Sequence, residues 1–83
     1  MQIEDIKKMI EQGLGGSEAK VVGDGTHFEA TVICDAFEGK RMLEQHRMVY
    51  ATLGDSMEGA IHAMSIRTYT PQGWEKAQQN KII

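Results

Sequence analysis

The sequence predicts one small α+β domain, in which helices pack against a three-stranded mixed sheet. Its length of 83 residues is typical of a single domain. Segments with apolar residues at helical spacing and segments rich in β-branched residues follow the order helix, strand, strand, helix, helix, strand, helix. The helices between the second and third strands form a crossover of the kind that joins parallel strands, whereas a short hairpin joins the first two.

The first helix is expected over residues 3–12, where one face carries Ile3, Ile6, Met9 and Ile10. Gly13 ends it. Strands are expected at residues 20–22 and 27–34, on either side of Asp24-Gly25, a dipeptide typical of β-hairpins. In the second strand, alternation places Phe28, Ala30, Val32 and Cys34 on one face.

A polar turn over residues 35–40 leads to a helix from about Arg41 into the early fifties. We expect its apolar stripe to consist of Met42, His46, Val49 and Leu53, thickened by Leu43 and Tyr50. At residues 54–56 the chain either breaks before a short helix that Gly59 ends, or kinks within one longer helix.

The third strand is expected to begin at Ile61, with His62, Met64 and Ile66 on its core-facing side. Thr70-Pro71 then starts the last helix, with threonine as N-cap and proline in the first helical position. Tyr69 and Trp74 are spaced as a hydrophobic staple across that start. The helix is expected to fray from about residue 79.

Composition excludes several classes of function. The formal net charge is −3, so no global positive field would hold nucleic acid. The first residues carry no signal peptide, and no apolar run is long enough to cross a membrane. The single cysteine, Cys34, excludes an intrachain disulfide and fits a reducing compartment, so we expect a cytoplasmic protein.

Two histidines form the candidate site. A histidine on the core-facing side of a strand, such as His62, is by chemistry alone more often a hydrogen-bonded core residue than a ligand. If the second and third strands are parallel neighbours, however, His27 and His62 both lie at the end of the sheet where these strands begin. Whether they face the same side is left open.

Three segments resemble motifs of the BolA family, and the match covers nearly the whole chain. They are Gly23-Asp24-Gly25-Thr26-His27-Phe28, then Phe37-Glu38-Gly39-Lys40 with His46-Arg47-Met48-Val49-Tyr50, and finally Ile61-His62-Ala63-Met64-Ser65-Ile66 with Tyr69-Thr70-Pro71. The resemblance implies a KH-like fold of the second type, and a single BolA-like domain over residues 1–83.

The resemblance also implies a partner and a cofactor. Such proteins pair with a monothiol glutaredoxin, and a 2Fe–2S cluster is held by the glutaredoxin cysteine, by glutathione and by the BolA-like chain. His62 matches the family's ligand in the third strand. The second ligand is a His or Cys of the hairpin loop, for which His27 is the candidate here. The isolated chain is expected to bind no cluster.

The resemblance therefore implies an adaptor for iron–sulfur cluster maturation, trafficking or iron sensing. Partner contacts are expected at Arg67, Thr70 and Pro71, and self-association is expected to be at most a weak homodimer. An enzyme is not expected, because no nucleophile stands at a readable spacing from a base and no phosphate loop occurs.

The alternative is a DNA-binding transcription regulator, since some family members have been treated as such. It would use a small basic cluster made of Lys40, Arg41, Arg47 and Arg67. RNA clamping of the KH type is not expected, because the GxxG letters of residues 13–16 stand between a helix and a strand and not between two helices.

Overall fold

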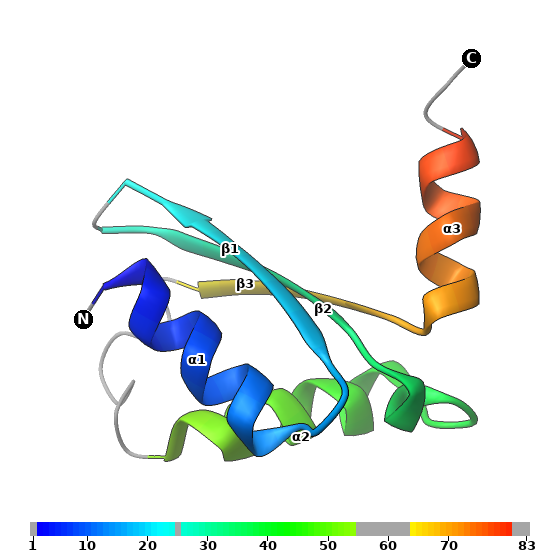
Figure 1. Cartoon of the computed structure of the whole chain (residues 1–83), viewed down its shortest axis with the longest axis horizontal. Helices are drawn as coiled ribbons and strands as arrows, with labels where there is room; N and C mark the ends of the chain where they lie inside the picture. The colour runs from blue at the N-terminus through cyan, green and yellow to red at the C-terminus, as the bar shows by residue number, and fades with distance from the viewer. Residues whose placement is uncertain (1, 25, 55–63, 81–83) are drawn as a thin grey trace.

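The computed structural model describes residues 2–24, 26–54 and 64–80. Its elements are α1 (Ile3–Gly13), β1 (Glu18–Gly23), β2 (Phe28–Ile33), the 3-10 helix η1 (Asp35–Phe37), α2 (Met42–Leu53), β3 (Met64–Tyr69) and α3 (Pro71–Asn80) (Figure 1). The predicted α+β class is confirmed. The short helix predicted to end at Gly59 and the predicted strand start at Ile61 lie outside the described residues.

The sheet has the strand order β1-β2-β3. β1 and β2 pair antiparallel, as the Asp-Gly hairpin predicts, and β2 and β3 pair parallel, as the crossover predicts. Phe28 lies beside Met64 in this parallel register, and Ile33 lies beside Tyr69. The sheet is therefore mixed, and β2 and β3 begin at the same end.

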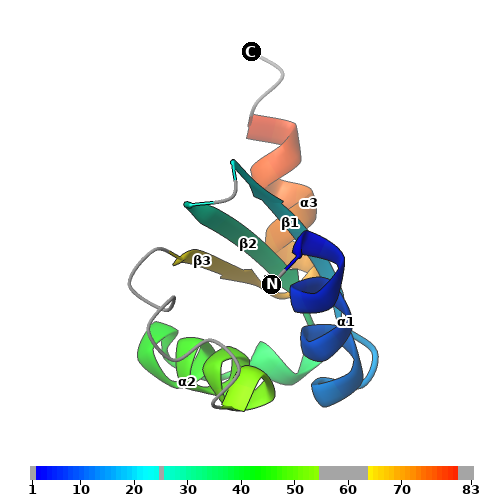
Figure 2. The same cartoon turned by 90° about the vertical axis from the view of Figure 1, so that its left-hand side faces the viewer.

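Helices α1 and α2 cover one face of the sheet (Figure 2). The core lies between these helices and the sheet. It consists of apolar side chains from both layers: Ile6, Ile10, Ala19, Phe28, Ala30, Val32, Cys34, Phe37, Val49, Leu53 and Met64. The predicted inward face of β2 is thus confirmed. Helix α3 lies at the far end of the sheet, beyond the last residue of β3, so the described elements leave most of the second face open.

The start of α2 differs from the prediction. Met42 and Leu43 are 70% and 62% exposed and do not belong to the apolar stripe. Gln45 faces inward instead, where its side-chain amide donates to the backbone oxygens of Phe37 and Lys40 and its amide oxygen accepts from the Thr68 hydroxyl. Gln45 thus anchors the first turn of α2 through polar bonds, and the fully buried Phe37 of η1 contributes to the core beside it.

The junction between β3 and α3 matches the prediction. The Thr70 hydroxyl accepts a hydrogen bond from the Gly73 N–H at 3.1 Å, so Thr70 is the N-cap. The Tyr69 and Trp74 rings meet edge to face with centroids 5.3 Å apart, which is the predicted staple. Helix α3 continues through Asn80, past the residue at which fraying is predicted to begin.

The outer edge of β1 is capped at Ala19 by side chains of α1. The Ala19 N–H donates to the Glu11 carboxylate at 3.0 Å, and the Lys7 ammonium donates to the Ala19 carbonyl at 2.9 Å. Lys7 and Glu11 also form an ion pair at 2.7 Å, one helical turn apart. This ion pair therefore satisfies both backbone groups that the buried Ala19 turns away from the sheet.

None of the helices within the described ranges is long and apolar enough to cross a membrane.

Candidate ligand site at the hairpin end of the sheet

The hairpin between β1 and β2 is organised by Asp24. Its carboxylate accepts hydrogen bonds from the Thr26 N–H at 3.0 Å, the Thr26 hydroxyl at 2.9 Å and the His27 N–H at 2.8 Å. The Asp24 N–H donates in turn to the His27 carbonyl at 3.2 Å. These bonds fix the backbone of His27 immediately before β2.

The same bonds hold the pKa of Asp24 at about 2, below its ordinary value of 3.8. The Thr26 N–H is the largest cause, followed by the His27 N–H and the Thr26 hydroxyl. Asp24 is therefore a carboxylate at neutral pH, and the loop keeps this anion beside the histidine.

Gly23 allows the two strands to approach closely here. A Cβ at this position would lie 2.5 Å from the His27 carbonyl oxygen and 2.8 Å from the Phe28 ring. No larger residue fits without moving the backbone that carries His27.

His27 is exposed and lines a hollow of about 390 Å³ at this end of the sheet. The other residues that line the hollow come from β1, the hairpin, β2 and β3: Val22, Gly23, Asp24, Glu29 and Ser65. Ser65 belongs to β3, so the parallel pairing brings the beginning of the third strand to the histidine of the second. The prediction that the second and third strands start at the same end of the sheet is confirmed, and the position of His62 there stays a prediction.

His62, the other predicted ligand, lies outside the described residues. It stands two positions before Met64 in the sequence, and two residues of fully extended chain span at most about 7 Å. Within the described ranges, no three His, Cys, Asp or Glu side chains gather closely enough to hold a metal ion. A metal group at this edge would therefore need ligands beyond those that the structure describes.

A family model for BolA-like proteins matches residues 2–73. The chain belongs to the BolA family. The DNA-binding transcriptional regulator BolA of Escherichia coli (strain K12) is 39% identical over 56 residues, which make up 68% of this chain and 53% of that protein. Protein BOLA2 of Arabidopsis thaliana is 49% identical over 59 residues, which make up 70% of this chain and 62% of that protein.

This BolA-like chain thus spans about half to three-fifths of the length of these curated relatives. The structure of a BolA protein homologue from Coxiella burnetii superposes with a TM-score of 0.80 at 49% sequence identity. That match covers 90% of this chain and 97% of the other. The comparison confirms that the arrangement of helices and strands is that of the BolA fold.

The four basic residues of the alternative interface are not brought together in this BolA-like domain. Lys40, Arg41 and Arg47 are exposed in or just before α2, which packs on the core-facing side of the sheet. Arg67 alternates with the inward-facing Met64 and Ile66 and therefore points to the open face. It lines a separate hollow of about 140 Å³.

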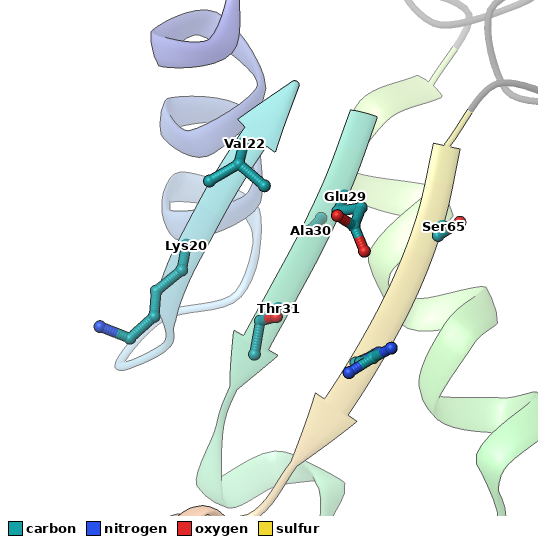
Figure 3. A pocket seen from close by; sticks show the side chains of 7 residues that line it. Lys20, Val22, Glu29, Ala30, Thr31 and Ser65 are labelled. Carbon is teal, nitrogen blue, oxygen red and sulfur yellow. The ribbon is translucent and has the colours of Figure 1, made fainter. Parts of the chain in front are cut away.

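That hollow is a shallow part of the open face of the sheet. Figure 3 shows Lys20 and Val22 on β1, Glu29 and Thr31 on β2, and Ser65 on β3. The sheet register places Lys20 beside Thr31 and Thr31 beside Arg67, so these three form one row across the strands. Val22, Glu29 and Ser65 form the next row toward the hairpin.

The predicted partner-binding residues at the other end of the sheet occupy different settings. Thr70 is half-buried and caps α3, whereas Pro71 is exposed. Pro71 lines a hollow of about 500 Å³ between the start of α3 and the beginning of β1, together with Gly16, Glu18, Ile33, Gln72, Trp74 and Glu75. The Lys20 ammonium lies 5.8 Å from the centre of the Trp74 ring, which ties α3 to the sheet.

Cys34 and His46 both lie in the packed part of the domain. Cys34 is 2% exposed at the end of β2, and its N–H donates to the Tyr69 carbonyl at 2.9 Å. It packs as a small apolar side chain, as predicted. His46 is half-buried on α2 and is remote in sequence from the hairpin.

Sequence reasoning did not assign Glu29 or Ser65 to the site. The signal was available, because the hairpin at Asp24 places Val22 beside Glu29, and parallel pairing of β2 with β3 places Glu29 beside Ser65. What the sequence could not supply was the register of β3. That register depends on packing of Met64 and Ile66 against the helices.

Proposed function

We propose that this BolA-like domain is an adaptor that pairs with a monothiol glutaredoxin and supplies imidazole ligands to a shared 2Fe–2S cluster. His62 is the first ligand and His27 the second. The observation that carries the proposal is the parallel pairing of β2 with β3 beside an exposed His27. This pairing places the hairpin histidine at the same end of the sheet as Met64, the residue that His62 precedes by two positions in the sequence.

The chemistry of the hairpin end fits this role. Imidazole nitrogen can replace thiolate on one iron of a 2Fe–2S cluster, as in Rieske centres. His27 is exposed in an open hollow, and its backbone is fixed by Asp24, so the histidine is available to an iron atom that a second protein brings. The remaining ligands would be the glutaredoxin cysteine and the thiol of glutathione.

The glutaredoxin would cover the open face that leads away from this site. Arg67 lies on that face, and Thr70 and Pro71 follow at the end of β3. Because Pro71 lines a hollow with the half-buried Trp74, the surface there offers apolar area beside polar groups. Such a mixture is typical of protein–protein contacts.

The test is anaerobic co-purification with a monothiol glutaredoxin and glutathione, followed by visible absorption of the cluster. We expect His62→Ala to change or abolish the spectrum of the shared cluster and His27→Ala to shift it. His46→Ala is the matched control, because it removes a histidine from α2 and should leave the spectrum unchanged. Unaltered spectra for both His62→Ala and His27→Ala would exclude the proposed site.

A DNA-binding function is the second candidate, favoured by the name of the Escherichia coli relative, DNA-binding transcriptional regulator BolA. Lys40, Arg41 and Arg47 are exposed and could bind phosphates, whereas Arg67 points to the other face of the sheet. Each phosphate that is no longer neutralised should reduce the steepness of log affinity against log salt by about 0.9. Charge-removing variants of these three residues should weaken DNA binding and leave cluster sharing intact.

A further inference from the structure

The two outer edges of the sheet differ in how their backbone groups are used. The Tyr69 carbonyl accepts from the Cys34 N–H, so the backbone of Tyr69 faces β2. In a continuous parallel ladder, the N–H and C=O of successive residues point alternately toward the neighbouring strand and away from it. The backbones of Ser65 and Arg67 therefore also face β2, and those of Met64, Ile66 and Thr68 face outward.

The outward groups of β3 lie on a free edge as far as the structure describes its surroundings. Within residues 2–24, 26–54 and 64–80, no backbone hydrogen bond reaches the N–H or C=O of Met64, Ile66 or Thr68 from outside the sheet. The corresponding groups of Ala19 on β1 are bound by Lys7 and Glu11. Among these residues a side-chain cap is present at Ala19 of β1 and absent along β3, and an uncapped edge is a template for another strand.

The sequence of β3 is suited to pairing with itself. When two copies pair antiparallel with Ile66 opposite Ile66, the three outward-facing residues of each copy all meet outward-facing residues of the other. In that register Ser65 lies opposite Arg67 of the second copy, so no like charges are directly opposed. Centring the pair on Arg67 would place two arginines opposite each other, and centring it on Ser65 would pair fewer backbone groups.

We propose that the β3 edge is a homodimer interface in which β3 strands of two copies pair antiparallel about Ile66. The occupant of the edge is a second copy of this chain, because the register that pairs the most backbone groups also avoids opposed charges. The two sheets then form one continuous sheet, with the open faces on the same side. The proposal does not depend on the cluster, since it rests on backbone groups of β3 and on charges of the open face.

The dimer should be weak. A single strand pair buries much less surface than the roughly 1,200–2,000 Å² of stable interfaces, so dissociation should be seen at accessible protein concentrations. Sedimentation equilibrium of the full chain over a wide concentration range measures its dissociation constant. A chain that stays monomeric at millimolar concentration would overturn the proposal.

Charge changes at Ser65 test the register. Ser65→Glu places a carboxylate opposite Arg67 of the second copy, and Ser65→Arg places a second cation there. Because the pair occurs twice in the dimer, we expect Ser65→Glu to lower the dissociation constant by about 2- to 30-fold and Ser65→Arg to raise it by a similar factor. Val22→Glu and Val22→Arg are matched controls in the same row on the β1 edge. They should leave the dissociation constant of the dimer unchanged.

A backbone change tests the edge itself. Ile66→Pro removes the outward N–H, which proline can do on an edge strand without breaking a bond to β2. Ile66→Ala shortens the same side chain but keeps the N–H. We expect dimerisation to be lost in the proline variant and largely kept in the alanine variant, with circular dichroism confirming that both fold. Equal dimerisation in the two variants, or equal effects of the Ser65 and Val22 charge changes, would show that the β3 edge is not the interface.

Discussion

The two edge strands of the sheet differ in how their outward backbone groups are bound within the described residues. At β1, an ion pair from α1 binds the N–H and C=O of the buried Ala19. At β3, the described residues provide no such cap, and the strand begins beside the hollow that holds His27. The comparison teaches that α1 caps β1 at Ala19, toward the end of the strand away from the hairpin, while β3 keeps outward backbone groups unbonded among the described residues.

Removing the cap of β1 should have the largest effect on stability. Glu11→Ala leaves the Ala19 N–H without its acceptor, and an unsatisfied buried N–H costs about 1–3 kcal/mol of the free energy of unfolding. Glu11→Gln keeps an acceptor and should lose less. Urea denaturation at neutral pH measures both, and equal losses would show that the hydrogen bond to Ala19 does not close the edge.

Removing the helix cap at the end of β3 should lower the free energy of unfolding by less than removing the cap of β1. Thr70→Ala removes the N-cap of α3 and should lower the free energy of unfolding by about 1 kcal/mol. Thr70→Ser keeps the hydroxyl and should retain most of this stability. Thermal unfolding of the pair provides the measurement, and an alanine variant as stable as the serine variant would argue against the cap.

Lowering the pH should destabilise the β1 edge before it destabilises β3. The pKa of Glu11 is lowered from its ordinary value of 4.5, chiefly by the hydrogen bond from Lys7 and then by that from Ala19. A lowered carboxyl pKa contributes stability that is present above pH 4.5 and is lost as the pH falls through the lower folded value. Asp24 should act in the same direction between about pH 3.8 and 2.

Amide hydrogen exchange can separate the two edges during this titration. Ala19 should lose protection relative to its value at neutral pH as Glu11 is protonated, once exchange is corrected for the intrinsic dependence on pH. Arg67, whose N–H faces β2, should keep its protection over the same range. Earlier loss at Arg67 than at Ala19 would contradict the assignment of the acid-sensitive edge to β1.

The smallest effects on stability are expected from the exposed residues that the dimer test uses. Ser65→Arg and Val22→Arg lie in one row on the open face, and substitutions at exposed positions usually change the free energy of unfolding by less than about 0.5 kcal/mol. Urea denaturation at low protein concentration, where the chain is monomeric, checks this. A larger loss in either variant would mean that the open face contributes to folding.

The sequence predicts most of what is local or topological. The Asp24-Gly25 dipeptide, the crossover between the second and third strands and the Thr70-Pro71 pair each identify a feature that the structure contains. These signals work because hairpin turns, parallel connections and helix starts depend on a few neighbouring residues or on chain order.

What the sequence does not predict depends on how separate elements pack. The polarity of Lys7 and Glu11 suggests a solvated helix face, and only the position of α1 along β1 turns them into an edge cap. Likewise Met42 fits an apolar stripe whose later members Val49 and Leu53 are buried, but the first turn of α2 is held by the polar bonds of Gln45 and leaves Met42 exposed. For the site, His27 is placed by the hairpin that the sequence predicts, and its role as a ligand stays a prediction, as does that of His62.

The most direct test of the proposed function is nuclear magnetic resonance of the isotopically labelled chain mixed with a cluster-loaded monothiol glutaredoxin. A paramagnetic 2Fe–2S cluster broadens the amide signals close to it. We predict selective broadening at Asp24, His27 and Ser65, with the Gly13–Gly16 turn at the opposite end of the sheet unaffected. Broadening centred on the first turn of α2 or on the Gly13–Gly16 turn would contradict a cluster held at the hairpin end. The absence of any broadening would contradict it as well.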